Sequence, residues 1–419
     1  DEAEFEDILG FKSQMEKMLY SKEQPWELCL NIQKKIREKR QKIEEIKKFL
    51  ENAKDDEREF LNEEISREID KLNNLKKQLK SLLSPSKMAQ NLGVEKLSIN
   101  LSEELYCLND AQNVHNLLEQ TIKARQDLTF DLGYIIPKVQ FVENPELDEY
   151  TFTISIHAVP VIEAKAYPNH LMYFEDELNI DKFPKNTIKT KDELSGRKVV
   201  WIEENACKDF WIKGITPCEY VVEYLKHFAI TNVSEIFSYS DINRYIELVS
   251  EHNSFLIDSI LGDFISVGEL KYIFCNLIRE RVSVKDVDFI FEKINDFSDE
   301  STKADLLDKL RVALSRQICH SLANEDNQIF GYEVSNELIS MLESQSEDEQ
   351  NEVVKIDGTK FSKFKKELKQ VLEQKAVLVA PQHLRQLLFV LISQIYTDIP
   401  VICLEEIANE FELKILGQV

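Results

Sequence analysis

Apolar residues recur at helical spacing through the first quarter of the chain. From Glu27 to Leu83 the sequence is rich in Lys, Glu, Ile and Leu and contains neither Gly nor Pro. Its apolar positions step by threes, fours and sevens, which is typical of a coiled coil. They include Ile32, Ile36, Ile43, Ile46, Leu50, Leu61, Ile65, Ile69, Leu72, Leu75, Leu79 and Leu82. The pattern predicts one long helix or a hairpin that turns near Asn52–Asp56. It fits a hairpin packed on its own chain as well as a device for self-association.

The next pattern is a helix followed by two strands. An apolar helical stripe ends at Gly133, a residue suited to the left-handed position after a helix, and Pro137 prevents the helix from continuing. A first strand then begins, and after a turn signal the residues from Tyr150 to His157 alternate between apolar and polar. This alternation predicts a half-exposed antiparallel sheet. The residues predicted to face water are Thr151, Thr153, Ser155 and His157.

The middle of the chain contains start signals for helices. One start signal is Thr216-Pro217-x-Glu219. It places Thr at the N-cap and Pro at the first helical position, and the carboxylate of Glu can accept a hydrogen bond from the backbone N–H of the N-cap residue. Similar pairs follow in series, each ahead of an amphipathic stripe, which predicts a compact helical domain with short loops. These pairs are Ser266 with Glu269, Ser283 with Asp286, and Thr302 with Asp305.

The C-terminal part returns to a mixed pattern of helices and strands. The predicted elements are a Lys-rich helix near Thr359–Gln374, a buried strand at Val377–Val379, a helix after Pro381, and strands at Pro400–Ile402 and Phe411–Leu416. A β-α-β order with a short final strand is typical of a small α/β unit.

These patterns predict an α+β multidomain chain: a small α/β domain with an inserted subdomain, a helical domain and a C-terminal α/β domain, preceded by a coiled-coil-like helical segment. The predicted boundaries are 1–94 for an N-terminal linker with the helical segment, 95–168 and 217–233 for the first α+β domain, 169–216 for the inserted subdomain, 234–323 for the helical domain, and 324–419 for the C-terminal α/β domain. Within the inserted subdomain the only clear strand signal is Val199–Ile202. Residues 1–26 are acidic with scattered aromatics, which indicates a tether or docking segment, and Ser84-Pro85-Ser86 ends the helical segment.

Composition excludes several classes of function. The formal net charge of −24 over 419 residues opposes binding to nucleic acid and adsorption to anionic lipid. Basic residues between Lys34 and Lys48 alternate with glutamates, as on a solvated helix face. The sequence lacks a run of 18 apolar residues, so no membrane span is expected. It begins without Met or a signal peptide, which indicates an excised fragment. Seven scattered cysteines indicate a reducing compartment.

Signals for catalysis are poor, and we expect neither an enzyme nor a cofactor or metal site. The sequence lacks a P-loop, a G-x-S-x-G elbow and an H-E-x-x-H helix. Cys319 and His320 are adjacent on a predicted helix, so their side chains diverge, and a buried thiol beside a surface histidine is expected.

Several segments together resemble one family. They are Ile122–Gly133 (IKARQDLTFDLG), Tyr167–Met172 (YPNHLM), Asp192–Ile202, Gly268–Asp286, Arg311–Ile318 (RVALSRQI), Val377–Leu391 and the C-terminal Ile415–Val419. In this order they resemble the cytoplasmic domain of the type III secretion export gate family, which includes flagellar and injectisome subunits. The resemblance covers roughly Lys96–Val419 and leaves the Glu27–Leu83 segment without a counterpart.

This resemblance implies a non-enzymatic role in protein transport. Family members carry a transmembrane half before this region, and the cytoplasmic half assembles as a ring, usually of nine copies, beneath the secretion pore. The ring receives chaperone–substrate complexes and other export-apparatus proteins and orders their export. The chain would then be the cytoplasmic domain of a bacterial inner-membrane protein, attached to the membrane only through the half that is absent here.

The resemblance also implies partner-binding residues. In flagellar members, chaperones dock in a cleft between the first domain and the inserted subdomain, through an Asp and a Phe of a DPAFG motif and a Thr in the following helix. Here the Asp position is Asp192, the Phe position holds Ser195 and the Thr position holds Glu223. The two departures favour altered partners or an injectisome-type member. Trp201 is expected in the core of the inserted subdomain, with a partner groove as the alternative, because aromatic anchors dominate binding hot spots.

A different class of function remains open beside this one. The chain could be a coiled-coil scaffold or adaptor without a role in secretion, whose N-terminal helices dimerise. Deleting residues 1–94 separates the two hypotheses, since self-association through the folded core survives only if the chain is an export-gate domain.

Overall fold

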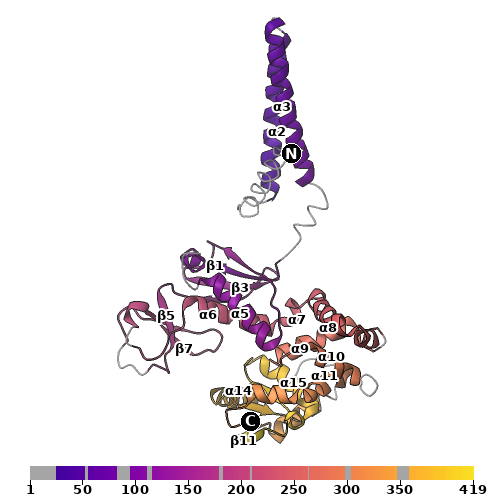
Figure 1. The fold of residues 1–419 in the computed structure, drawn as a ribbon. Coiled ribbons are helices and arrows are strands. Elements are labelled where there is room, and N and C mark those ends of the chain that lie inside the picture. The colour runs from indigo at the N-terminus through magenta and orange to yellow at the C-terminus, as the bar shows by residue number, and fades with distance from the viewer. Residues whose placement is uncertain are drawn as a thin grey trace. The chain divides into compact units, whose positions relative to one another are not determined.

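The computed structural model describes residues 25–51, 55–82, 95–110, 116–178, 183–207, 210–262, 264–297, 303–346 and 358–419. The chain divides into two compact units, residues 1–94 and residues 95–419 (Figure 1). Most of the predicted tether, the Ser84-Pro85-Ser86 helix end and the Thr302 cap lie outside the described residues. Among the helices described, none has the length and apolar character needed to cross a bilayer.

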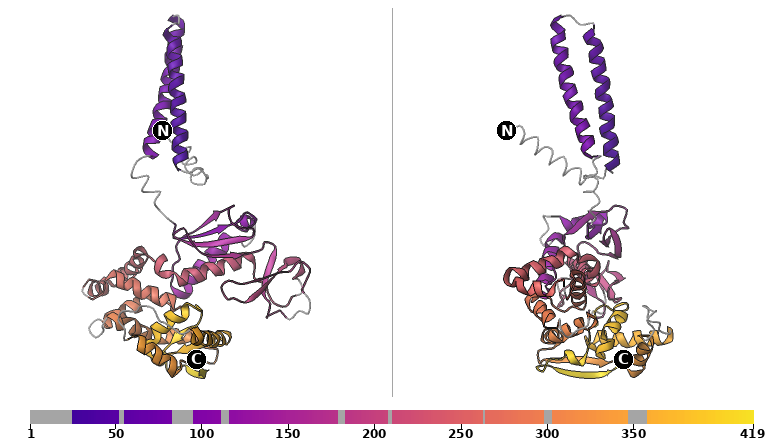
Figure 2. Two further views of the ribbon diagram at one scale, coloured as in Figure 1. Left: turned by 180° about the vertical axis from the view of Figure 1, so that it is seen from behind. Right: turned by 90° about the vertical axis from the view of Figure 1, so that its right-hand side faces the viewer.

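The first unit contains a pair of helices, α2 (Pro25–Glu51) and α3 (Asp55–Leu82), that lie side by side (Figure 2). Of the two alternatives left open by the sequence, the structure therefore has the hairpin. The helices bury most of the predicted apolar stripe, including Ile32, Ile36, Ile43, Ile46, Ile65 and Leu72. Ile69, which the pattern placed in the stripe, is exposed.

One carboxylate is buried across the hairpin. Glu68 accepts hydrogen bonds from Lys39 at 2.7 Å, Lys42 at 3.2 Å and Lys71 at 3.3 Å. The hydrogen bond from Lys39 contributes most to lowering the pKa of Glu68 to about 2, against the opposing effect of burial. The three lysines therefore keep Glu68 ionised at neutral pH. Lys39 and Lys42 lie on α2 and Glu68 on α3, so their ion pairs also hold the two helices in register.

The second unit opens with a four-stranded sheet. Its strands are β1 (Leu97–Leu101), β2 (Val139–Glu143), β3 (Thr151–Ile156) and β4 (Val159–Lys165), in the order β2-β1-β3-β4. The sequence predicted that β2 and β3 form an antiparallel sheet, and this pairing is wrong. β1 lies between them, parallel to β2 and antiparallel to β3. β1 has only three alternating apolar positions, too few for its pattern to mark a central strand.

The polar face of β3 is also not in water as predicted. Thr151, Thr153 and Ser155 are all buried, because β3 is a central strand. The side-chain amide of Asn100, on the neighbouring β1, donates to the hydroxyls of Thr153 at 2.8 Å and Ser155 at 2.9 Å. Short polar side chains that are hydrogen-bonded in this way can be buried at little cost. His157 follows in the turn after β3 and is exposed, as expected.

Two helices pack beside this sheet, α5 (Leu117–Leu132) and α6 (Pro217–Thr231). α5 ends at Gly133, which is left-handed with φ of 72°, so the predicted helix end is confirmed. The capping box of Thr216 and Glu219 at the start of α6 is confirmed as well.

Residues between the sheet and α6 form a second, three-stranded sheet. Its strands are β5 (His170–Phe174), β6 (Ile188–Lys191) and β7 (Lys198–Glu203), in the order β5-β7-β6 and all antiparallel. The sequence identified only β7, because β5 and β6 are short edge strands with weak alternation. Two 3-10 helices follow strands of these sheets. η1 (Glu103–Asn109) comes directly after β1 of the first sheet, and η2 (Glu204–Ala206) comes directly after β7 of the three-stranded sheet.

Helices make up the next part of the chain. They are α7 (Val233–Ile236), α8 (Tyr239–Ile260), α9 (Val267–Arg279), α10 (Val287–Asp296), α11 (Lys303–Ala313) and α12 (Ser315–Leu322). The predicted capping box of Ser266 and Glu269 is confirmed at the start of α9. The predicted cap at Ser283 is wrong: Asp286 is the N-cap of α10, and its carboxylate accepts from the backbone N–H of Phe289 at 3.3 Å. The hydroxyl of Ser283 instead donates to the carbonyl of Asp131 at 2.8 Å.

The last part of the chain forms a parallel four-stranded sheet with helices. Its strands are β8 (Gln328–Glu333), β9 (Val377–Val379), β10 (Val401–Ile402) and β11 (Glu412–Gln418), in the order β10-β9-β8-β11. Its helices are α13 (Asn336–Ser346), α14 (Gly358–Glu373), α15 (Gln382–Ser393) and the 3-10 turn η3 (Leu404–Glu406). The predicted helices near 359–374 and after Pro381 are confirmed. β8 was missed, and the final strand, predicted to be short, has seven residues.

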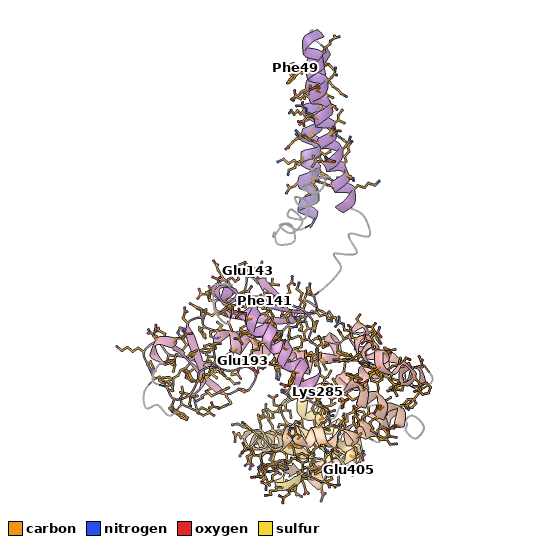
Figure 3. The ribbon with its side chains drawn as sticks, viewed as in Figure 1. Phe49, Phe141, Glu143, Glu193, Lys285 and Glu405 are labelled. Atoms are coloured by element: carbon orange, nitrogen blue, oxygen red, sulfur yellow. The ribbon has the colours of Figure 1, made fainter. Side chains whose placement is uncertain are left out.

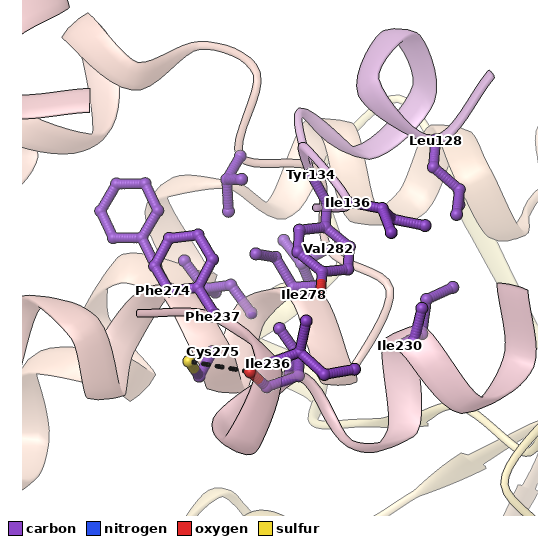
Figure 4. Close-up of a cluster of buried hydrophobic side chains, with 14 of the residues drawn as sticks. Leu128, Tyr134, Ile136, Ile230, Ile236, Phe237, Phe274, Cys275, Ile278 and Val282 are labelled. Carbon is purple, nitrogen blue, oxygen red and sulfur yellow. Dashed lines mark hydrogen bonds between the residues drawn. The ribbon is translucent and has the colours of Figure 1, made fainter. Parts of the chain in front are cut away.

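A continuous core joins the first sheet to the helices that follow it. Tyr134 and Ile136, just after α5, pack among residues of α7 and α9 (Figure 4). In the same cluster the thiol of Cys275 donates to the carbonyl of Val233 at 3.9 Å. The helices therefore position the C-terminal end of α5 rigidly.

Candidate functional site

The turn between β6 and β7 holds the first predicted site residue. Asp192 is only 4% exposed, and its carboxylate accepts hydrogen bonds from the hydroxyls of Tyr220 at 2.9 Å and Tyr224 at 2.7 Å, both on α6. It also accepts from the backbone N–H of Ser195 at 2.8 Å and from its hydroxyl at 2.5 Å. Asp192 thus joins the three-stranded sheet to α6.

These hydrogen bonds decide the protonation state of Asp192. Burial by itself would raise the pKa of the carboxyl, but the hydrogen bonds from Ser195, Tyr224 and Tyr220 outweigh it, and the pKa lies below its ordinary value. Burial raises the pKa of both tyrosines, so they remain protonated donors. The group is therefore a satisfied, buried carboxylate at neutral pH rather than a reactive acid.

Trp201 lies in the core, as expected. It is fully buried on β7, and its ring meets the ring of Tyr220 edge-on at 5.2 Å between centroids. On its other side it meets Tyr167 at 5.5 Å. Tyr220 contacts both Trp201 and Asp192, so the structure brings these two predicted residues together around one side chain of α6.

The other two predicted residues are exposed. Ser195 reaches solvent beside the Asp192 carboxylate. Glu223 lies on the solvent side of α6 and forms an ion pair with Lys226 one turn further along the helix. Of the four predicted residues, only these two have exposed side chains.

A groove opens at the other end of the β6–β7 hairpin. This junction groove has a volume of about 600 Å³ and is lined from the first sheet and from the three-stranded sheet. Its lining residues are Glu104, Cys107, Tyr150, Tyr167, Pro168, Asn169, His170, Ile188, Glu203 and Asn205. Tyr167 forms part of its wall and packs on Trp201 from behind, with Tyr150 at 5.2 Å between ring centroids.

Sequence reasoning did not single out the lining of this groove. One signal was available, because Tyr167-Pro168 belongs to a segment that resembles the export-gate family. No sequence pattern marked Tyr150, Ile188 and Glu203 as residues of a site. Each lies at the end of a different strand, and only the tertiary fold brings them together.

The groove carries aromatic, aliphatic and polar side chains. Within the described residues, His, Cys, Asp and Glu do not gather in any group suited to a metal ion. The thiol of Cys319 is buried and donates to the carbonyl of Glu406 at 3.2 Å, while His320 is exposed, so the pair does not act together. Aromatic and aliphatic side chains with a polar rim are typical of a protein-binding groove.

Replacing Asp192 with asparagine is expected to destabilise the second unit by about 1.5–3 kcal/mol at neutral pH, because several donors lose a charged acceptor. The lowered pKa of Asp192 means that its stabilisation is present above the unfolded value of about 3.9 and is lost as the pH falls below it. Urea denaturation at pH 7 and pH 3 measures this: the difference between the variant and the unaltered chain should shrink at pH 3. Asp176→Asn is the control, because that carboxylate pairs with Arg197 on the surface. An equal loss of stability in Asp192→Asn and Asp176→Asn would contradict the conclusion that the buried carboxylate of Asp192 stabilises the fold.

The described residues thus form a mixed α/β protein with a groove between two of its sheets. The FHIPEP family matches residues 27–412, and the chain belongs to this family. The flagellar biosynthesis protein FlhA of Treponema pallidum is 23% identical over 355 residues, covering 80% of this chain and 49% of that protein. The chain therefore spans about half the length of the curated relative it matches.

Solved structures share the fold of this chain. The structure of the CdsV and CdsO complex of Chlamydia pneumoniae matches with a TM-score of 0.66 and 21% identity, over 78% of this chain and 97% of that one. The nonameric EPEC SctV-C matches with a TM-score of 0.60 and 17% identity, over 78% of this chain and 99% of that one.

Proposed function

We propose that this chain is the cytoplasmic docking platform of a type III secretion export gate in a bacterial inner membrane. In this role it receives chaperone–substrate complexes and other export-apparatus proteins and orders their export without catalysing a reaction. Membership of the FHIPEP family is the observation that carries the proposal. The aromatic junction groove and the strongly acidic composition support it, because both suit the binding of proteins.

Assembly into a ring, with nine copies as the expected number, is part of the proposal. The similar EPEC SctV-C is nonameric, and the similar CdsV forms a complex with CdsO. A ring suits a docking platform because neighbouring copies present the same groove repeatedly, which raises the effective concentration of binding sites.

We place partner recognition in the junction groove and on the exposed side chains near the β6–β7 turn. The carboxylate of Asp192 already accepts several hydrogen bonds within the chain, so it shapes the surface rather than contacting a partner. Ser195 and Glu223 are the exposed positions at which this chain departs from the flagellar pattern. The partner set is therefore expected to differ from that of flagellar members.

A thiol in the groove provides a direct test. Cys107 lines the groove and is exposed, whereas the other cysteines with described side chains, Cys207, Cys218, Cys275, Cys319 and Cys403, are buried. Although Cys107 is exposed, partial desolvation of its sulfur raises the pKa of the thiol, so a thiol reagent should be used at mildly alkaline pH. Adding a cognate export chaperone with its substrate bound is expected to slow labelling of Cys107 in the full chain at least several-fold.

A pair of variants locates the contact. Ile188→Ser in the groove is expected to weaken binding of the chaperone–substrate complex at least about tenfold, as loss of an apolar anchor does. Val159→Ser is the matched control, since Val159 is exposed at the start of β4 and does not line the groove. Unchanged labelling and equal affinity of both variants would contradict docking in the groove, and absence of binding to any cognate complex would contradict the proposed function.

A further inference from the structure

The charges of the helical hairpin, α2 with α3, are unevenly placed along its length. Lys39 and Lys42 reach Glu68, so the part of α2 before Lys39 lies level with the part of α3 after Glu68. Residues 30–42 contain six basic residues and one acidic residue, and residues 68–80 contain four and two. Towards the turn, residues 43–51 contain two basic and three acidic residues, and residues 55–67 contain two and six. The hairpin is therefore basic at the end that holds residues 25 and 82 and acidic towards its turn (Figure 2).

Most cations of the basic half are exposed and have no partner on the hairpin. Among the residues that the structure describes, no carboxylate forms an ion pair with seven of them. We call these seven exposed side chains the basic stem: Lys34, Lys35, Arg37 and Arg40 of α2, and Lys76, Lys77 and Lys80 of α3. At about 100° per residue they are spread around both helices rather than gathered on one face. Such a collar of cations suits a wide anionic surface better than a shaped pocket.

The two kinds of charge are far apart compared with the range of electrostatic forces. Residues 25–35 and 72–82 contain five lysines and one carboxylate, Glu27. At a rise of about 1.5 Å per residue, these lysines lie within about 15 Å of the hairpin's ends. The acidic stretch 55–67 begins more than about 20 Å from the end of α3, whereas physiological salt screens charges beyond about 8 Å. An anionic surface at the ends of the hairpin therefore attracts the lysines and hardly senses the acidic half.

The hairpin offers such a surface its charge and not an apolar face. Its apolar stripe is buried between the two helices. Leu30 is exposed at the basic end, but a single leucine does not make an apolar face. The exposed Phe49 lies near the turn, in the acidic half (Figure 3). A helix that inserts into a bilayer has apolar and basic residues side by side along its length, so contact of this hairpin with lipid would be electrostatic and sensitive to salt.

We propose that the basic stem binds the anionic head groups of a lipid bilayer, with the acidic half of the hairpin directed away from it. The inference rests on the proposed function, because that function places the chain at a membrane surface. It adds a binding partner for the hairpin. The charge of −24 opposes adsorption of the chain as a whole, and the stem reverses the sign locally. A nucleic-acid duplex fits less well, since a rod lying along the hairpin would bring phosphates against its acidic half.

The partition of the full chain onto lipid vesicles tests this proposal. The unaltered chain is expected to bind vesicles of phosphatidylcholine with about 30% phosphatidylglycerol at about 50 mM salt, and to be released at about 500 mM. Changing four stem lysines to glutamate is expected to weaken binding at least about 100-fold, because each lysine near the surface contributes to the attraction. The changes are Lys34→Glu, Lys35→Glu, Lys76→Glu and Lys77→Glu. They leave the lysines around Glu68 in place, so circular dichroism should show an unchanged helix content.

A control variant of the same net charge separates the stem from the charge of the whole chain. It changes four exposed lysines of the second unit: Lys123→Glu, Lys138→Glu, Lys165→Glu and Lys198→Glu. Because these lysines lie outside the hairpin, the control should bind the anionic vesicles within about twofold of the unaltered chain. An equal loss of binding in both variants would show that net charge alone decides adsorption, and would overturn the proposal.

Other outcomes would overturn it as well. The unaltered chain could fail to bind the anionic vesicles, bind pure phosphatidylcholine vesicles equally well, or bind a short DNA duplex more tightly than either. If it bound no vesicles and the stem variant alone changed the salt dependence of sedimentation, the stem would serve an acidic protein surface instead. Binding of the chaperone–substrate complex to the junction groove does not involve the stem, so it tests the proposed function separately in each of these cases.

Discussion

Replacing Arg311 with methionine is expected to lower the free energy of unfolding of the second unit by about 3–5 kcal/mol, because it leaves two buried carboxylates, Glu280 and Glu406, with Arg385 as their remaining buried cation. Arg311, on α11, is 2% exposed. Its guanidinium donates to both carboxylate oxygens of Glu406, at 2.7 and 2.8 Å, and lies 2.9 Å from a carboxylate oxygen of Glu280. Arg385 of α15 is also buried and pairs with Glu280 and Asp308. This network ties α11 and the C-cap residue of α9 to α15 and η3 in the C-terminal part of the chain.

Chemical denaturation with both fluorescence and circular dichroism measures the loss. Arg316→Met is the matched control: Arg316 lies on the next helix and pairs with Glu410 at the surface, so its unfolding midpoint should hardly move. Replacing Glu406 with leucine in the Arg311→Met background should recover part of the lost stability, because it removes a buried carboxylate whose remaining cation, Arg385, lies 3.4 Å away. Equal midpoints for Arg311→Met and Arg316→Met would show that the buried network contributes no more than a surface pair.

Gly133→Ala is expected to lower the free energy of unfolding of the second unit by about 3 kcal/mol, for two reasons that can be measured separately. Gly133 has φ of 72°, and a left-handed conformation costs an L-residue about 1–2 kcal/mol. A Cβ at this position would also lie 2.5 Å from the backbone nitrogen of Lys285 and 2.8 Å from the carbonyl carbon of Val284. Moving that backbone costs a further amount of about 1–3 kcal/mol, as for an overpacked core.

Gly196→Ala separates the two causes. Gly196 has nearly the same φ, 67°, but a Cβ there would approach only the side chain of Lys191, at 3.6 Å. The control should therefore show the conformational cost alone, and the difference between the two variants measures the close approach at Gly133. If thermal unfolding showed the same loss of stability for Gly133→Ala and Gly196→Ala, the backbone at residues 284–285 would have moved away from the new Cβ without cost.

Local sequence signals were sufficient for most helices. The stripes of α2 and α3, the left-handed end of α5 and the caps of α6 and α9 all depend on residues within one or two turns of each other. The failure at Ser283 has a physical reason in the tertiary structure. Its hydroxyl binds the carbonyl of Asp131, far away in sequence, and the helix therefore starts at the next suitable acceptor, Asp286.

Strand pairing and the site required long-range information. β1 separates β2 from β3, and no pattern within either strand specifies that order. The sequence likewise pointed to Asp192 and Trp201, but it could not show that both are buried against Tyr220. The groove residues Tyr150, Ile188 and Glu203 come from three strand ends, so only the fold makes them neighbours.

The amino-acid sequence by itself determined the hairpin-forming stripe, most helix boundaries, the acidic character and the family resemblance, because these depend on spacing and composition along the chain. The tertiary structure alone decided which strands pair, which carboxylates are satisfied internally and where exposed apolar side chains gather into grooves. The reason is that burial and register are set by partners distant in sequence, such as Arg311 with Glu406, whose meeting no local pattern encodes.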